Sequence, residues 1–288
     1  MSAPVKATTP ASGVERPGHP PAFDAAGKKR KPEGRALVWS LRLGTIALIL
    51  GSWELCASMG VVDELFTSKP SAIAVAFWNL LPNGQIWQDT FVTVTEVLLG
   101  FSLSAVAGIL VGLVLSSIRV LADALEPILN ALNTVPRIAL IPLFVAWFGL
   151  GVTPRIVLAF TIAFFIMATT VTAALASPNK DLQLLAKSLG ATRRQTMLKF
   201  VLPGATPVIA SGLQLSLIYS FLGVIAAEIV SGSAGLGTRM TAYANSFQAA
   251  SYFAVLVILT IVSTILTTAI RRTEKRLLRW HAYESAGN

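Results

Sequence analysis

Long apolar stretches separated by short polar segments dominate the pattern of this sequence. A helix that spans a membrane needs about 20 predominantly apolar residues. Six stretches are of roughly this length: 38–60, 92–117, 128–150, 156–176, 208–230 and 252–270. The third contains Pro136, Arg137 and Pro142, and proline is tolerated in a membrane helix where neighbouring helices or water satisfy the freed backbone groups. The pattern therefore predicts an all-α integral membrane fold with five to six transmembrane helices, the third of them kinked and packed against protein.

Two of the connecting segments carry helical patterns of their own. Segment 61–91 contains SKPSAIAVAFWNLL, whose apolar residues recur at helical spacing. This favours a short helix on the outer surface as much as a packed connection without one. Segment 177–207 begins with Ser177 as a candidate N-cap and Pro178 at the first helical position, where its missing N–H costs nothing. An apolar stripe at helical spacing follows, made of Leu182, Leu185, Ala186 and Leu189.

The second half of segment 177–207 predicts another short helix. Gly190 follows the apolar stripe as a left-handed helix terminator, and Thr192 with Gln195 matches the capping box S/T-x-x-E/Q. We expect this helix to end at Pro203–Gly204. Basic residues accompany both apolar faces, so periodicity alone favours two roles for this segment equally. The segment either rests on lipid headgroups or docks as a helix in a groove of a partner protein.

Composition and charge support membrane insertion and indicate an orientation. Of the 288 residues, 54% are hydrophobic and 13% are charged, which is about half of the roughly 25% in an ordinary soluble domain. Most of the net charge of +9 lies next to the ends of the apolar stretches, which favours orientation signals over a nucleic-acid-binding surface. With the N-terminus inside, 17 Lys and Arg residues lie near the membrane on the cytoplasmic side and three on the outer side. This bias predicts that both termini are cytoplasmic.

The chain is expected to have one folded domain between two tails. Residues 1–35 are rich in Pro, Ala, Gly and Lys, a composition that cannot bury a core and predicts a disordered basic cytoplasmic tail. Residues 36–281 form the transmembrane domain, and residues 282–288 form a short C-terminal tail. The single cysteine, Cys56, excludes a disulfide framework within the chain, and we expect it to be a small buried apolar residue.

No residue pattern indicates enzyme chemistry. The sequence has no G-x-x-x-x-G-K-[ST] phosphate loop, and its two histidines, His19 and His281, lie near opposite ends of the chain. We therefore expect no catalytic site, no metal and no bound cofactor. The glycines of SGSAGLG, residues 231–237, have the wrong spacing for a nucleotide site. They favour a tight turn that leads into a re-entrant or gating segment.

Ionisable residues within membrane spans are functional candidates by default. Three glutamates fall in the outer halves of their spans: Glu54, Glu96 and Glu228. Each of them lines a gate, snorkels outward, or pairs with Arg155 or Arg239. Arg137 lies near the inner end of the third span, deep enough to attract an anion. The candidates for a pathway or its gate are Arg137, Glu96, Glu228, Gly235 and Gly237.

Segment 177–207 also carries a specific pattern: A-x-x-x-G, nine residues, an apolar residue, x and L-P. This pattern resembles the signature loop of permease subunits of binding-protein-dependent ABC importers. The matching residues are Ala186, Gly190, Leu202 and Pro203, with Phe200 where isoleucine is usual. Leucines at 184 and 185 replace the usual glutamate and first alanine, so the contacts of this loop are expected to be more apolar than in the family.

Three further segments resemble the branch of this family that imports nitrate, taurine and alkanesulfonates. They are PRIALIPLFVAWFGLG (136–151), SGSAGLG (231–237) and RRTEKRLLRW (271–280). The resemblance implies a permease subunit in the bacterial cytoplasmic (inner) membrane that pairs with a second copy. Separate cytoplasmic ATPase subunits would bind ATP, and an extracytoplasmic solute-binding protein would deliver a small anion for import by alternating access.

Within that resemblance, segment 177–207 is the coupling loop that meets the ATPase subunit. The residues expected to take part are Leu182, Leu184, Leu185, Ala186, Ser188, Leu189, Gly190, Ala191, Thr192, Arg193, Leu202 and Pro203. The alternative function is a secondary transporter of small solutes, which would need coupling-ion sites near the bilayer midplane. No acid–base pair is visible there, and a membrane enzyme lacks any plausible set of catalytic residues.

Overall fold

The computed structural model describes residues 33–60, 67–176 and 180–277. The chain divides into two units, residues 1–52 and 53–288, and helix α1 (Glu33–Ser58) runs from the first into the second. The part of α1 in the first unit exposes apolar side chains such as Leu41 and Leu48, as expected for a surface that meets lipid. Most of the predicted basic tail, and the expected cap at Ser177 and Pro178, lie outside the described residues.

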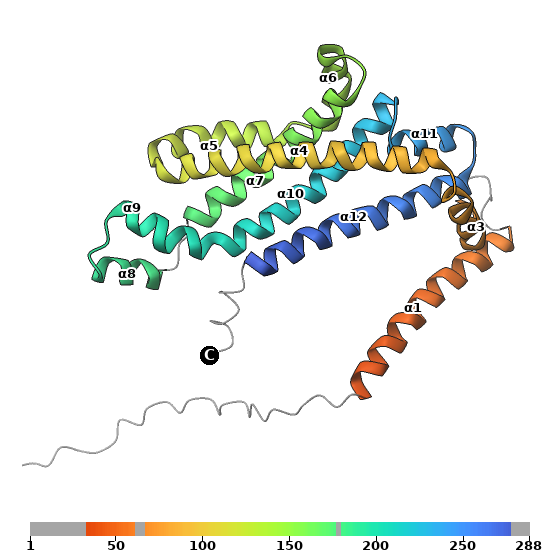
Figure 1. Ribbon diagram of the computed structural model, residues 1–288, viewed down its shortest axis with the longest axis horizontal. Helices are drawn as coiled ribbons and strands as arrows, with labels where there is room; N and C mark the ends of the chain where they lie inside the picture. The colour runs from red at the N-terminus through yellow and green to blue at the C-terminus, as the bar shows by residue number, and fades with distance from the viewer. Residues whose placement is uncertain (1–32, 61–66, 177–179, 278–288) are drawn as a thin grey trace, which may run out of the picture. The chain divides into compact units, whose positions relative to one another are not determined.

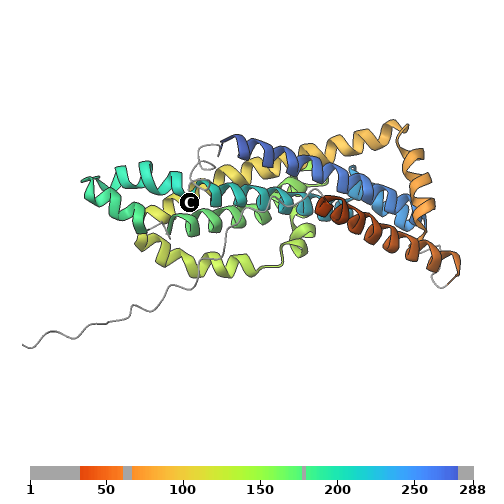
Figure 2. The same cartoon turned by 90° about the horizontal axis from the view of Figure 1, so that it is seen from below.

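The second unit is a bundle of helices (Figure 1). Its α-helices are α3 (Pro70–Leu80), α4 (Gly84–Ser117), α5 (Arg119–Thr134), α6 (Ile141–Phe148), α7 (Val152–Ala176), α8 (Lys180–Ser188), α9 (Arg193–Thr196), α10 (Leu202–Ser231), α11 (Leu236–Asn245) and α12 (Ala249–Leu277). Two other helical turns join them: the 3₁₀ turn η1 (Arg137–Leu140) and the π-helical turn η2 (Met197–Val201). Both views place α8 and α9 at one end of the bundle and α3 and α11 at the other (Figures 1 and 2).

Five described helices are long and apolar enough to cross a membrane, and a bent pair could supply a sixth. The five are Leu37–Ser58, Gly84–Ser117, Val152–Ala176, Arg193–Ser231 and Ala249–Glu274. The pair, Val120–Thr134 with Arg137–Phe148, is bent by 76°. The break follows from Pro136, because proline disfavours helical geometry in the preceding residue and Val135 is extended (φ −62°, ψ 126°). The predicted number of spans and the kink in the third are confirmed.

The prediction that the second helix of segment 177–207 ends at Pro203–Gly204 is wrong. The helix continues, and Arg193–Ser231 forms one apolar run of 39 residues. The turn before the proline is π-helical, with the Leu202 N–H donating to the Met197 carbonyl five residues back. Proline has no N–H and normally clashes with the carbonyl four residues earlier. The wider turn accommodates its ring, and Pro203 occupies the first turn of α10.

Small residues bring α4, α7 and α10 close together in the centre of the bundle. A Cβ atom placed at Gly108 on α4 would lie 2.6 Å from the Cβ of Met167, and one at Gly112 would lie 2.5 Å from the Cβ of Val171, both on α7. On α10, a Cβ atom at Gly223 would lie 2.9 Å from the Cα of Ala159. Close helix approach through small residues is the usual way in which membrane helices gain packing contacts. A larger side chain at any of these glycines would therefore force the central helices apart.

Helix α3 confirms the predicted short helix in segment 61–91. Its N-terminus is fixed by Glu54, whose carboxylate accepts hydrogen bonds from the Ser71 N–H (3.0 Å) and hydroxyl (2.7 Å). The described hydrogen bonds of Glu54 are those from Ser71, and none joins it to an arginine. The Trp53 ring meets the edge of Phe253 on α12 with centroids 5.8 Å apart. Cys56, expected to be buried, is exposed.

Candidate functional site

The corner between α8 and α9 has the backbone geometry of a Schellman motif. Gly190 adopts a left-handed conformation with φ +65°. Its N–H donates to the Lys187 carbonyl, and the Ala191 N–H donates to the Ala186 carbonyl, both at 3.0 Å. This pair of hydrogen bonds is the one that terminates many helices at glycine. The predicted role of Gly190 as a helix terminator is confirmed.

Helix α9 begins with the predicted capping box. The Gln195 N–H donates to the Thr192 hydroxyl oxygen at 3.3 Å, and the Thr192 N–H donates to Gln195 Oε1 at 2.9 Å. Two backbone donors that the helix itself cannot satisfy are thereby paired. Because Gly190 terminates α8 and Thr192 caps α9, the corner is defined on both sides by local hydrogen bonds.

We expect replacement of Thr192 with alanine to loosen this corner. The change removes the acceptor for the Gln195 N–H, and loss of such a cap typically costs about 1 kcal/mol. Hydrogen exchange at the Gln195 amide should accelerate about fivefold, which corresponds to that free energy. The Thr192→Ser variant keeps the acceptor and should exchange at the parent rate. Equal exchange in parent and alanine variant would show that the cap does not stabilise the corner.

The corner exposes leucines that no other described part of the chain covers. Leu184, Leu185 and Leu189 are 62%, 50% and 67% exposed, whereas Ala186 is fully buried. Both positions that depart from the family pattern, 184 and 185, thus lie on the exposed surface. Ser188 donates to the Leu184 carbonyl at 3.0 Å and lies within α8. Leu182 also lies in α8, but its side chain is outside the described residues.

The exit from the corner is tied to the centre of the bundle. Val201 of η2 and Ala205 of α10 belong to a buried cluster with Met167, Val171 and Leu175 of α7, and Met197 and Leu202 pack against it. Arg193 is exposed but lines a cavity of about 1060 Å³ with residues of α4, α5 and α7. Movement of the corner would therefore be transmitted to α7 and α10 by direct packing.

Arg137 lies beside this cavity and does not itself line it. Its guanidinium carbon is 4.4 Å from the ring centroid of Phe165, which is one of the lining residues. Its Nη2 donates to the Leu132 carbonyl at 3.2 Å and to Asn133 Oδ1 at 3.0 Å. Arg137 therefore satisfies a carbonyl in the last turn of α5, a common role of basic side chains at a helix C-terminus. Asp123 and Glu126 are the acidic residues of the lining.

At the opposite end of the bundle, Glu96 of α4 and Arg155 of α7 form a buried ion pair. Arg155 Nη1 lies 2.8 Å from Glu96 Oε1, and each side chain is 1% exposed. Arg155 also donates to the Ala234 carbonyl at 2.9 Å and to the Ser233 hydroxyl. Pairing of Glu96 with Arg155 was one of the predicted alternatives and is confirmed, whereas snorkelling of Glu96 is wrong because its side chain is buried.

Glu228 of α10 is completely buried and accepts two hydrogen bonds. Thr93 Oγ1 donates to its Oε1, and the Gly237 N–H donates to its Oε2, both at 2.7 Å. A Cβ atom at Gly235 would lie 2.1 Å from Glu228 Oε1, and one at Gly237 would lie 2.9 Å from Glu228 Cβ. These glycines therefore make room for a buried carboxylate. The other arginine considered as its partner, Arg239, pairs instead with Asp89 at 2.6 Å.

Sequence reasoning found Glu96, Arg155 and Glu228 but missed Asp89 and Thr93. Together with Glu96 and Gly100 they recur at i, i+4, i+7 and i+11 along α4. Such spacing places small and polar residues on one helical face, and this face is buried rather than lipid-exposed. This polar stripe within an apolar span is the signal in the sequence that could have indicated a buried network.

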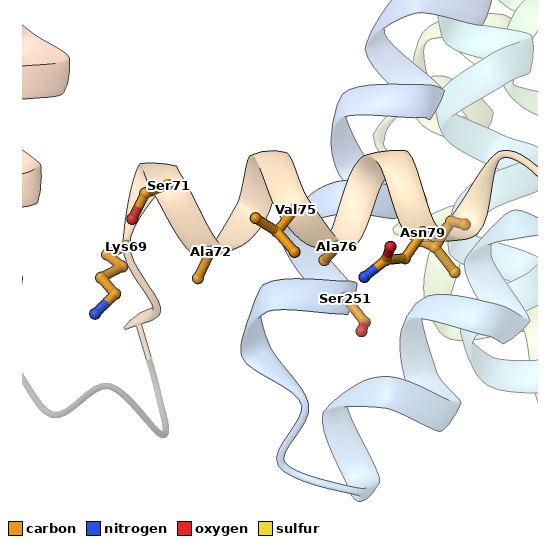
Figure 3. Close-up of a pocket in the computed structure, with 8 residues that line it drawn as sticks. Lys69, Ser71, Ala72, Val75, Ala76, Asn79 and Ser251 are labelled. Atoms are coloured by element: carbon orange, nitrogen blue, oxygen red, sulfur yellow. The ribbon is translucent and has the colours of Figure 1, made fainter.

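A second hollow lies beside α3. It has a volume of about 480 Å³ and is lined by one face of α3 together with Lys69 and Ser251 (Figure 3). The polar groups along it come from Lys69, Ser71, Asn79 and Ser251. The hollow is open and shallow, and it is separate from the buried cluster of charges.

The chain matches the family model described as "Binding-protein-dependent transport system inner membrane component" over residues 104–279. A Bacillus subtilis (strain 168) chain named as an aliphatic sulfonates transport permease protein is 29% identical over 272 residues, covering 94% of this chain and 99% of that protein. The taurine transport system permease protein of Escherichia coli (strain K12) is 28% identical, and the match covers 84% of this chain and 90% of that protein. The riboflavin transport system permease protein of Chloroflexus aurantiacus is 30% identical, with 83% and 89% covered.

Solved structures support the fold. An inward-facing structure of the MetNI methionine ABC transporter aligns with a TM-score of 0.57 at 24% identity, covering 68% of this chain and 97% of that chain. An amino acid ABC transporter aligns with the same TM-score at 16% identity, covering 70% and 97%. The resemblance found in the sequence is thus confirmed. The chain belongs to the family of binding-protein-dependent transport system inner membrane components and is a multi-pass permease of an ABC importer.

Proposed function

We propose that this chain imports a small organic anion of the sulfonate or taurine class, driven by separate ATPase subunits that dock on the α8–α9 corner. The observation that carries the proposal is the exposed leucine surface of that corner, Leu184, Leu185 and Leu189, on a backbone fixed by a Schellman motif and a capping box. A rigid apolar helix that lacks a partner within its own chain suits a groove on another protein.

The partners follow from what the chain contains. Its sequence has no phosphate loop, so ATP would be bound by the ATPase subunits and no cofactor by this chain. Membership of a binding-protein-dependent family implies a solute-binding protein. A second copy of the chain would complete the pathway, and lipid would cover exposed apolar side chains such as Leu103 and Ile265.

The charge pattern supports the orientation. Basic residues cluster in the tail 28–35, in the α8–α9 segment and at the end of α12, and Lys and Arg accumulate on the cytoplasmic side of membrane proteins. The corner would then face the cytoplasm, where ATP is available, and α3 and α11 would face outward. Closure of the ATPase subunits would push on the corner and, through Val201 and Ala205, on the central helices. This is the route by which we propose that alternating access is driven.

The substrate class rests on the relatives, because the permease sequence itself carries little information about the cargo. Proteins named for aliphatic sulfonates and for taurine match most of the chain. The relative named for riboflavin is equally similar, so the scaffold is compatible with a different cargo. In the proposed system the solute-binding protein makes the selection.

Reconstitution tests this proposal directly. The chain is placed in liposomes with its ATPase subunits and solute-binding protein, and ATP hydrolysis is measured with and without taurine or a short alkanesulfonate. Hydrolysis should rise several-fold with the loaded binding protein, and labelled substrate should accumulate only with ATP. A secondary transporter would behave differently: uptake by this chain alone, driven by an ion gradient, would overturn the proposal. Stimulation by riboflavin but not by sulfonates would overturn the substrate class alone.

A further inference from the structure

We propose that Glu96, Arg155 and Glu228, with Asp89 and Thr93, form a buried latch that fixes the position of the turn 231–237 and of helix α11. The latch works chiefly through hydrogen bonds, and Glu228 is its central acceptor. These are positioning residues for the transport cycle, so the inference rests on the proposed transport function. Helix α11 is thereby expected to move together with α4 and α7 as one body when the transporter changes state.

The turn depends on side chains from other helices. Gly232 (φ +35°) ends α10, and Gly235 (φ +106°) precedes α11. Between them, Arg155 of α7 donates to the Ala234 carbonyl at 2.9 Å and to the Ser233 hydroxyl. One buried guanidinium therefore holds two consecutive residues of the turn. Because Arg155 is itself paired with Glu96, the turn is connected to α4 and α7 at the same time.

The start of α11 is held in the same way. The first backbone N–H groups of a helix have no acceptor within it, and in α11 three consecutive ones are taken by side chains. The Gly235 N–H donates to Asp89 Oδ1 (3.3 Å), the Leu236 N–H to Thr93 Oγ1 (3.0 Å) and the Gly237 N–H to Glu228 Oε2 (2.7 Å). Two of the three acceptors are carboxylates, which also interact favourably with the positive end of the helix dipole. Helix α11 is thus joined at its N-terminus to α4 and α10.

The two buried glutamates differ in how many hydrogen bonds they accept. Both oxygens of Glu228 accept a hydrogen, one from Thr93 and one from Gly237. Glu96 accepts from Arg155 at Oε1 only, and its Oε2 accepts no hydrogen bond from any described residue. An amide group in place of a carboxylate keeps one acceptor and turns the other into a donor. Position 96 can therefore tolerate an amide, whereas at position 228 the new donor would face a group that now donates, either the Thr93 hydroxyl or the Gly237 N–H.

This difference provides a matched pair of variants. Glu96→Gln and Glu228→Gln change the shape of the side chain very little, and each removes one carboxyl group from the same cluster. Only Glu228→Gln places a donor against a group that holds the start of α11, either Thr93 or Gly237. Hydrogen bonds to a charged group contribute about 1.5–3 kcal/mol, which corresponds to a change of roughly tenfold or more. We expect at least a tenfold loss of ATP-driven uptake in Glu228→Gln and a change within about twofold in Glu96→Gln.

The experiment uses the full transporter in liposomes and adds hydrogen exchange at the Leu236 and Gly237 amides. Glu228→Gln should accelerate exchange at these amides about tenfold and leave ATP hydrolysis in the absence of substrate at the parent level. If that variant does not fold, Thr93→Val, with Thr93→Ser as control, tests the same bonds with the shape conserved. Equal losses in the two glutamine variants would show that charge alone matters and would overturn the latch. Parent-like uptake and exchange in Glu228→Gln would overturn it as well.

The outcome can be separated from that of the proposed function. The hydrogen-exchange measurement needs no substrate and no ATPase subunit, so it tests the latch even if the parent transporter shows no ATP-driven uptake. Absence of uptake in the parent, with the expected acceleration in Glu228→Gln, would refute the proposed function and keep the latch as a structural element. ATP-driven uptake in the parent with no difference between the variants would do the reverse.

Discussion

Replacement of Gly190 with valine should abolish substrate-stimulated ATP hydrolysis and uptake while the chain remains inserted and folded in the membrane. Gly190 has φ +65°, a conformation that costs other L-residues roughly 1–2 kcal/mol and β-branched residues more. No atom lies within 4 Å of a Cβ placed there, so the effect comes from the backbone and not from a steric clash. The valine variant would escape the strain by reorienting α8 relative to α9.

The measurement is ATP hydrolysis and uptake in liposomes, with the assembly of permease and ATPase subunits followed by co-purification. Gly190→Asn is the matched control, because asparagine enters the left-handed region far more readily than valine. It should keep most of the uptake. Normal coupled transport by the valine variant would refute a coupling role for the corner. Equal failure of both variants would point to the space around position 190 and away from its backbone conformation.

Replacement of Gly112 with leucine should prevent the chain from folding into a stable bundle. The Cβ atom alone of a leucine at position 112 would lie 2.5 Å from the Cβ of Val171 and 3.1 Å from the Ala168 carbonyl oxygen. Backbone atoms of α7 cannot move aside, so α4 and α7 must separate. Overpacking typically costs about 1–3 kcal/mol for a few extra methylenes. We expect a larger loss here, because the separation would disrupt contacts along both helices.

Thermal unfolding in detergent, with fluorescence-detected size exclusion, measures this effect. Gly51→Leu is the matched control, since Gly51 also lies in a long apolar helix and no atom lies within 4 Å of a Cβ placed there. Leucine favours helix more than glycine does by up to about 1 kcal/mol, so the control should be as stable as the parent. An unfolding temperature for Gly112→Leu within a degree or two of the parent would contradict the packing of α4 against α7.

Local features of segment 177–207 were predicted from the sequence in detail. The terminator at Gly190 and the capping box at Thr192 depend on hydrogen bonds between residues three to five positions apart, so a short stretch of sequence specifies them. The end of the second helix was predicted wrongly at Pro203. Proline is a reliable breaker only for a regular α-helix, and the π-helical turn just before it depends on packing that the local pattern does not reveal.

The buried charges show the opposite case. Glu96 and Glu228 were recognised as intramembrane candidates and Arg155 as a possible partner, but most of the partners of these three residues lie 59 to 135 positions away in the chain. Gly235 and Gly237 were expected to form a tight turn, and the turn is present, yet the reason for glycine is a carboxylate on another helix. Contacts of this kind are decided by which faces of distant helices meet, which periodicity does not specify.

Four properties of this protein could be predicted from the sequence alone: the class of fold, the number of spans, the helix caps at Gly190 and Thr192, and the family. Each of these depends on composition or on residues that are neighbours in the chain, where the hydrophobic effect and local hydrogen bonding act directly. Only the tertiary structure decided that Glu96 pairs with Arg155, that Glu228 holds the start of α11 and that Leu184 and Leu185 are exposed. The physical reason is that the free energy of a charged or apolar side chain depends on whether it is buried. Burial is decided by how the helices pack, which the local sequence does not specify.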